Sequence, residues 1–347
     1  MPFAPKPEPA GRPHALAPLG RMRASARLGA FVYLTAIIAV VGSERIYWYW
    51  AGIDVASIAA LAAFYALPVA AALWLLAYVP GRSGEQVVLA GAAYALLVEG
   101  VLTPVLYEDG PLPALALMFI AWHGLIAFAG LWYVAHRWLV ERRTRPLLAA
   151  AAVLGLWWGV WARASSATEP PSADDVAEMG LDPTLLAPAE FAAYAALSCV
   201  ALAASHLLLA RVVPVGWRPT RRSLQLVAVI VAICFIVLIV PAVPWAPLKI
   251  VPLLGIVWIA LRRGWDGEGS ATALDRLAGP VRIRDAALLF VLPASAAAAY
   301  ALLWQVSNAG GLSILYWSMA GVQAAAGATA VALVGVRAVR AGRPARG

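Results

Sequence analysis

The charged residues of this chain are gathered into short clusters, which leaves long stretches with no charge between them. Examples are LGAFVYLTAIIAVVGS at 28–43 and AALLFVLPASAAAAYALLWQVSNAG at 286–310. An apolar helix of about 20 residues matches a hydrocarbon core about 30 Å thick. Because a bilayer offers the backbone no hydrogen-bond partners, such stretches are expected to be helices. The sequence therefore predicts an all-α polytopic membrane protein with about ten transmembrane helices.

The composition agrees with this fold class and argues against a nucleic-acid partner. Of the 347 residues, 63% are hydrophobic and 13% are charged, whereas a soluble domain carries about 25% charged residues. The excess of 26 Lys and Arg over 18 Asp and Glu would suit nucleic acid in a soluble protein. Here the arginines flank apolar stretches, as the positive-inside rule predicts for a cytoplasmic membrane face. The bilayer is the expected partner, and the oligomeric state is left open.

The chain divides into ten expected spans. They cover 28–50, 53–79, 86–106, 112–135, 146–162, 189–212, 223–241, 246–261, 286–306 and 312–336. Residues 1–27, rich in Pro, Ala and Arg, are expected to form a disordered cytoplasmic tail, and 337–347 a basic cytoplasmic tail. A signal peptide cut after Gly42 is an alternative, but the apolar stretch continues to Trp50, which favours an uncut span. The prolines of 241–252 leave open whether that segment is a loop or a broken helix.

The basic residues also predict the topology. With the N-terminus inside, 23 of the 26 fall in cytoplasmic segments, so both termini are expected in the cytoplasm of a multi-pass cell-membrane protein. Residues 163–188 form an acidic extracytoplasmic loop between helices 1–5 (28–162) and helices 6–10 (189–336). Two halves of five spans would be inverted relative to each other, a 5+5 arrangement that is common in secondary transporters.

Glu99 is the first candidate site residue. An ionisable group within a span is costly and usually faces an interior cavity. Its helical neighbours Ala92, Ala95 and Thr103 are small, which favours close packing against another helix. Pro104, one turn later, is expected to kink the span. We therefore interpret Glu99 as a candidate catalytic or coupling carboxylate, with a purely structural carboxylate as the alternative.

His123 is its candidate partner. The third and fourth spans are joined by the tight turn EDGPLP, so they are expected to be antiparallel neighbours. From the helical rise, Glu99 lies about 10 Å and His123 about 16 Å below the outer surface. The pair could relay protons, bind an ion or orient a substrate. A histidine satisfied by a neighbouring carbonyl is the alternative.

Further polar and aromatic residues surround this depth. We expect an outward-facing site with substrate-binding contributions from Glu44, Arg45, Tyr107, Glu108, Trp122 and Lys249. Arg45 at that depth is expected to pair with an acid or with an anionic headgroup. Anchoring in an aromatic belt is the alternative for Glu44 and Arg45.

The sequence predicts neither a metal site nor a particular cofactor. His136 and His206 lie on different spans and could ligate haem, but nothing else supports haem. Cys199 and His206 share a helix face, and two ligands are too few for a metal. Histidine boxes, HExxH, GxSxG and P-loop motifs are absent,.

Three hypotheses of function follow. The first is a secondary transporter or flippase for a small or lipid-like solute, with Glu99 as the coupling carboxylate. The second is a membrane-embedded enzyme for a lipid-linked or isoprenoid substrate, with the same Glu and His as acid, base or ligand. The third is a non-catalytic subunit of a membrane complex.

Overall fold

The structure is a computed structural model that describes residues 24–47, 55–79, 84–110, 114–168, 186–263, 272–306 and 309–341. Throughout these ranges the chain forms helices and turns and no strand. The tail up to residue 23, the aromatic residues 48–50, residues 169–185 of the acidic loop and residues 342–347 lie outside the described ranges. The predictions made for them are not addressed by the structure.

Within the described ranges, nine helices are long and apolar enough to cross a membrane. Three of them include a π-helical segment. The first span joins α1 (Ala24–Val40) to η1 (Val41–Arg45), and the third joins α3 (Gly84–Leu97) to η2 (Val98–Leu102). The fourth joins α4 (Ala114–Phe119), η4 (Ile120–Val134) and α5 (Ala135–Glu141). The prediction of an all-α polytopic membrane protein is confirmed.

The remaining elements complete the bundle. They are α2 (Val55–Tyr78), η3 (Val105–Tyr107), α6 (Thr144–Thr168), α8 (Pro188–Val212), α9 (Arg221–Leu238), α10 (Ala246–Arg263), η5 (Ala273–Leu277), α11 (Ile283–Ala286), η6 (Ala287–Phe290), α12 (Val291–Trp304) and α13 (Ala309–Ala341). Helices α1, α6 and α13 reach several residues into segments that the sequence predicted as tails or loop. The ends of the apolar stretches in the sequence therefore underestimate the lengths of these helices.

Helix α10 corresponds to the eighth expected span. It begins at Ala246 after a series of turns, and it includes Pro252 in its interior. The segment 241–252, for which the sequence left a loop or a broken helix open, therefore consists of turns before Ala246 and helix from Ala246 onwards. A proline costs one backbone hydrogen bond, and the helix continues around Pro252. Lys249, Arg262 and Arg263 give α10 three charged residues, and α10 is not among the nine helices counted above.

Contacts between helix ends agree with the expected orientation of the spans. The guanidinium of Arg27, at the start of α1, donates to the carbonyl of Val213 just after α8, at 2.9 Å. Both ends are expected on the cytoplasmic side. Lys249, at the start of α10, pairs with Asp109 in the turn after η3, and both are expected outside. Helix ends that the basic residues assign to the same side of the membrane are therefore in contact in the structure.

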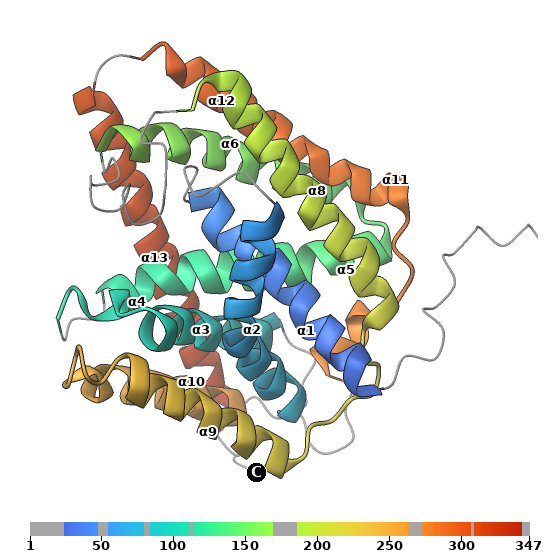
Figure 1. The fold of residues 1–347 in the computed structure, drawn as a ribbon, viewed down its shortest axis with the longest axis vertical. Helices are drawn as coiled ribbons and strands as arrows, with labels where there is room; N and C mark the ends of the chain where they lie inside the picture. Colours follow the sequence, from blue (N-terminus) through green and yellow to red (C-terminus); the bar gives the residue numbers. More distant parts are fainter. Residues whose placement is uncertain are drawn as a thin grey trace, which may run out of the picture.

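Small residues allow the closest helix packing. A Cβ placed on Gly155 of α6 would meet the carbonyl of Leu292 at 2.2 Å, and one on Gly159 would meet that of Ala296 at 2.1 Å. Glycines four residues apart are a common device for helix contact in membranes. Helices α6, α8 and α12 lie together at one end of the molecule, and α9 and α10 lie along the opposite edge (Figure 1).

The inverted 5+5 arrangement stays a prediction. In the first half α1 packs extensively on α2, and α3 on η4. Among the described residues, the corresponding pairs of the second half, α8 with α9 and α10 with α12, do not pack extensively. The two halves therefore differ in their closest contacts.

Candidate functional site

Glu99 and His123 are in direct contact. The Nε2 of His123 lies 2.6 Å from the Oε1 of Glu99, and Thr103 Oγ1 donates to the other carboxylate oxygen at 3.0 Å. Glu99 is 8% exposed and His123 is fully buried. A buried ionisable group needs a partner, and Glu99 supplies one to His123 Nε2, while His123 Nδ1 is buried without a hydrogen-bond partner among the described residues.

Glycines explain why the two spans approach so closely. A Cβ on Gly91 of α3 would lie 2.6 Å from the carbonyl oxygen of Gly124, which follows His123. A Cβ on Gly42 of η1 would lie 2.7 Å from the Cα of Ala127. Three spans, the first, third and fourth, can therefore converge with their backbones nearly touching.

All three converging spans are π-helical at the ionisable residue that each contributes to this cluster. Glu44 lies in η1, Glu99 in η2 and His123 in the 15-residue η4. A π turn makes i→i+5 hydrogen bonds, is rare, and occurs frequently at functional sites. The coincidence of three such segments marks this cluster as the candidate site.

Glu44 joins the cluster from the first span. The hydroxyl of Tyr65 donates to its Oε1 at 2.6 Å. Glu44 is also close enough to interact electrostatically with both His123 and Glu99. Two carboxyl groups therefore share the surroundings of one imidazole.

Aromatic rings enclose the pair. The indole of Trp122 stacks on His123 with ring centroids 5.1 Å apart and on Tyr47 at 3.7 Å. The ring of Tyr94 approaches His123 at 6.0 Å. These rings fix the orientation of the imidazole and exclude water from it.

Two residues predicted to bind substrate make internal contacts with the π segments. Trp122 Nε1 donates to the carbonyl of Ser43 in η1 at 2.7 Å. The hydroxyl of Tyr107 donates to the carbonyl of Gly100 in η2 at 2.8 Å. Both donors satisfy carbonyls of π turns and so support their geometry. A contact of Trp122 or Tyr107 with substrate stays a prediction.

Arg45 is fully buried beside α8. Its guanidinium lies 4.1 Å from the ring centroid of Tyr194, and its Nε donates to Ser198 Oγ at 3.3 Å. A cation over an aromatic face is stabilised by the ring quadrupole. The structure thus adds Tyr194 and Ser198 to the surroundings of Arg45. A pairing with an acid or a phosphate stays a prediction.

Glu108, Asp109 and Lys249 lie at the outer end of the site. Lys249 pairs with Asp109 and also donates to the carbonyl of Gly110 at 2.9 Å. Glu108 is exposed, and partial burial together with the carboxyls of Glu99 and Asp109 raises its pKa. Glu108 therefore places a second carboxyl between Glu99 and the aqueous surface.

A second buried pair lies near the expected cytoplasmic side. The Nδ1 atoms of His136 and His206 are 3.1 Å apart, and His136 Nε2 lies 3.2 Å from the carbonyl oxygen of Leu277. Axial haem ligands lie on opposite faces of the iron, and nitrogens this close leave no room for one. The haem alternative does not fit this geometry. Within the described ranges, no group of three or more His, Cys, Asp or Glu could hold a metal ion.

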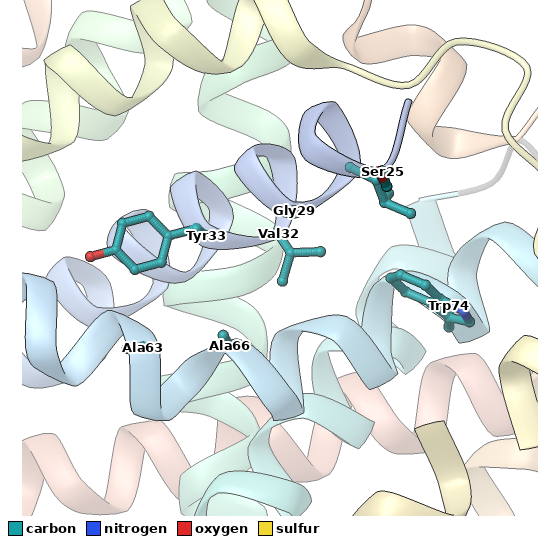
Figure 2. A pocket seen from close by; sticks show the side chains of 8 residues that line it. Ser25, Gly29, Val32, Tyr33, Ala63, Ala66 and Trp74 are labelled. Carbon is teal, nitrogen blue, oxygen red and sulfur yellow. The ribbon is translucent and has the colours of Figure 1, made fainter. Parts of the chain in front are cut away.

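Two apolar cavities lie away from the Glu99–His123 pair. One, of about 540 Å³, lies between α1 and α2, where Val32 lies opposite Ala66, with Tyr33 towards one end and Trp74 towards the other (Figure 2). The other, of about 360 Å³, lies between α2, α3, α9 and α10. Since Glu99 is nearly buried and His123 fully so, the structure holds the pair in a closed arrangement. The expected outward opening stays a prediction.

The chain is a multi-pass membrane protein by its helices. No protein-family model, curated protein or solved structure matches it.

Proposed function

We propose that the protein is a proton-coupled secondary transporter or flippase of the cell membrane, and that Glu99, His123 and Glu44 form its proton-binding site. The observation that carries this proposal is the buried 2.6 Å contact between Glu99 and His123, set in π-helical segments of two adjoining spans. Ionisable groups at such depth commonly mark ion and proton pathways.

The chemistry of the cluster suits reversible protonation. With one proton on the pair, Glu99 is a carboxylate and His123 an imidazolium, or both are neutral. A second proton is accepted by Glu44, which then keeps its hydrogen bond with Tyr65. Because the two carboxyls surround a single imidazole, full ionisation leaves a net negative charge that favours proton uptake or a bound cation.

Access from the outer side runs along neighbouring carboxyls. The exposed Glu108 interacts electrostatically with Glu99, and Glu99 touches His123. His123 in turn interacts with Glu44. We propose that protons pass between the surface and the buried end by way of these four groups.

A membrane-embedded enzyme acting on a lipid-linked or isoprenoid substrate is the second candidate. The apolar cavity on the opposite face of α3 favours it, because a hydrocarbon chain could bind there while the same Glu and His act as acid and base. The two candidates differ in outcome, since an enzyme changes its substrate covalently and a transporter does not.

The test uses proteoliposomes loaded with a pH-sensitive dye. A pH gradient is imposed, and pools of solutes and amphiphiles are added to wild type, Glu99→Gln and Glu141→Gln. Glu141 is a matched control, since its carboxylate pairs with Arg137 at the end of α5 and is partly exposed. We expect at least one pool to dissipate the pH gradient in vesicles with wild type and with Glu141→Gln. With Glu99→Gln the same pool should dissipate the gradient at least about tenfold more slowly.

Equal rates for wild type and Glu99→Gln, with both proteins inserted and folded, would overturn the proposal. Recovery of a covalently altered lipid from the same vesicles, lost in Glu99→Gln, would favour the enzyme instead.

A further inference from the structure

The cavity between α1 and α2 is a groove in the side of the molecule (Figure 2). Small residues line it, with Gly29 on α1 and Ala63 and Ala66 on α2. A Cβ on Gly29 would meet nothing within 4 Å. Because Gly29 and Ala63 are exposed, the groove is open to the hydrocarbon layer that surrounds the spans.

The two ends of the groove differ. At one end the hydroxyl of Tyr33, in the middle of the first span, donates to the carbonyl of Ala59 at 3.0 Å and bridges α1 to α2. At the other end Trp74 packs edge-to-face on Trp217, with ring centroids 4.5 Å apart. Trp217 lies in the connection between α8 and α9, on the expected cytoplasmic side. Since tryptophans are enriched at membrane interfaces, the groove runs from this interface to the middle of the bilayer.

A second cavity continues the groove at its interfacial end. It has a volume of about 540 Å³, and Arg27 of α1 and Trp217 are among the residues that line it. Ser25 and Leu28 line both cavities. The two cavities therefore form one continuous depression, which is apolar between α1 and α2 and carries a cation at the interface.

Arg27 supplies a positive charge that no described carboxylate neutralises. Its Nε and Nη2 donate to the carbonyls of Val212 and Val213 at 3.3 and 2.9 Å, and it makes no ion pair with any described residue. Arg218, next to Trp217, is already paired with Asp275. A guanidinium has about five N–H donors, so Arg27 keeps donors for an anion. Phosphate is the anion that a guanidinium binds best through two parallel hydrogen bonds.

The length of the groove suits a lipid chain. From Ser25 to Tyr33 it follows α1 for about 12 Å at 1.5 Å per residue. The hydrocarbon of one leaflet is about 15 Å deep, half of the core thickness. An acyl chain that fills the groove therefore has its headgroup at the interface, beside Arg27.

We infer that the groove and its Arg27 end form a binding site for an anionic phospholipid of the leaflet at the expected cytoplasmic face. One acyl chain lies between α1 and α2, and the phosphate accepts hydrogen bonds from the remaining N–H groups of Arg27. The bound lipid joins α1 and α2 to the end of α8. The site is separate from the Glu99–His123 pair, so the inference does not depend on the proposed function.

The test uses the full chain in phosphatidylcholine nanodiscs that contain a small fraction of a photoactivatable lipid. One probe is phosphatidylglycerol with a diazirine in an acyl chain, and the other is phosphatidylcholine with the same chains. The anionic probe is expected to label the groove around Val32 and Ala66, with competition by unlabelled phosphatidylglycerol. It should label the groove about fivefold more than the other probe, as expected of one basic residue beside an anionic lipid.

Two variants test the two parts of the site. Arg27→Gln should remove the preference for the anionic probe. Arg222→Gln should keep it, because Arg222 is exposed at the start of α9 and lines neither cavity. Gly29→Phe fills the groove and should abolish its labelling by both probes. Gly321→Phe is the matched control, since a Cβ there also meets nothing within 4 Å and Gly321 lines neither cavity.

Equal labelling by the two probes in wild type, or a preference that persists in Arg27→Gln, would overturn the anionic headgroup and with it the inference. Labelling that persists in Gly29→Phe would place the chain outside the groove and overturn it as well. Thermal unfolding in detergent shows which variants are folded. The comparison of the two probes in wild type needs no variant, so it can overturn the inference even where a variant does not fold.

Discussion

Gly91 and Gly124 face each other across the third and fourth spans with no space for a side chain on either. A Cβ on Gly91 would lie 2.6 Å from the carbonyl oxygen of Gly124, and a Cβ on Gly124 would lie 2.9 Å from that of Gly91. This contact fixes the distance between the backbones of α3 and η4. The short reach between Glu99 and His123 depends on it.

Gly91→Ala is therefore expected to destabilise the protein by about 1–3 kcal/mol, the usual cost of overpacking. Gly321→Ala is the matched control, because a Cβ there meets nothing within 4 Å. Alanine is a better helix former than glycine by about 1 kcal/mol, so the control should be neutral or stabilising. Thermal unfolding in detergent measures both, and a stabilised Gly91→Ala would contradict the close contact.

Lys249→Met should destabilise the protein, because it leaves Asp109 without its cation near the membrane surface. Removing one partner of a buried pair costs about 3–5 kcal/mol, and the partial exposure of Asp109 lowers this expectation to roughly 2 kcal/mol. The double variant Lys249→Met/Asp109→Asn should recover part of the loss. Arg143→Ala, which removes a largely exposed pair with Glu141, should have little effect. Strictly additive effects of the two single changes would argue against the pair.

Glu108→Gln should raise stability at neutral pH and not at acid pH. Partial burial and the carboxyls of Glu99 and Asp109 raise the pKa of Glu108 above its usual value near 4.5. The ionised form therefore costs stability in the folded state at pH 7.5, and the cost disappears as the pH falls through the raised pKa. The melting temperature of variant and wild type should converge towards pH 4.5.

Asp275→Asn should lower the stability of the folded protein, whereas Glu108→Gln should raise it. Although burial alone would raise the pKa of Asp275, hydrogen bonds from the backbone of Gly216 and Thr272 and from Arg218 hold it below the usual 3.8. Its contribution is present above that value and is lost as the pH falls through the lowered pKa. The variant should be destabilised equally at pH 7.5 and pH 5. A pH-dependent difference in this range would contradict the assignment.

His136→Leu should cost about 1–3 kcal/mol, because it removes the buried partner of His206 Nδ1 and of the carbonyl of Leu277,. The double variant His136→Leu/His206→Leu should cost less than the sum of the two single changes. Thermal unfolding of the four proteins gives the coupling. Additive effects would mean that the Nδ1 atoms do not share a hydrogen.

Both termini are expected in the cytoplasm, and residues 163–188 on the outer side. Single cysteines in a Cys199→Ala/Cys234→Ala background can be labelled by a membrane-impermeant maleimide in intact cells. A cysteine at Ser172 should react, and one at Ala345 should react only after the membrane is opened. Labelling of position 345 in intact cells would contradict the topology.

The Glu99–His123 contact could be predicted because few alternatives existed. An acid within a span needs a partner, and the turn EDGPLP places the fourth span beside the third. His123 is the ionisable residue of the fourth span that lies at a depth comparable to that of Glu99. The short turn between the two spans and the energetic cost of an unpaired carboxylate in the membrane were therefore sufficient to predict this contact.

The other contacts depend on long-range packing that has no local signal. Tyr194 and Ser198 reach Arg45 from α8, and their position follows from the rotation of that helix. The meeting of His136 and His206 depends in the same way on how α5 and α8 pack. Helix type was also beyond prediction. The residues IAWHGLIAFAGLWYV of η4 have the composition of an ordinary apolar α-helix.

The π turn at Glu99 has a geometric consequence for motion. A π turn holds one residue more than an α turn, and each residue of an α-helix turns the chain by about 100°. If the extra residue passes from one side of Glu99 to the other, the carboxyl swings by about that angle while the helix ends stay in place. Such a shift would separate Glu99 from His123 without unfolding a turn or parting the glycines of α3 and η4.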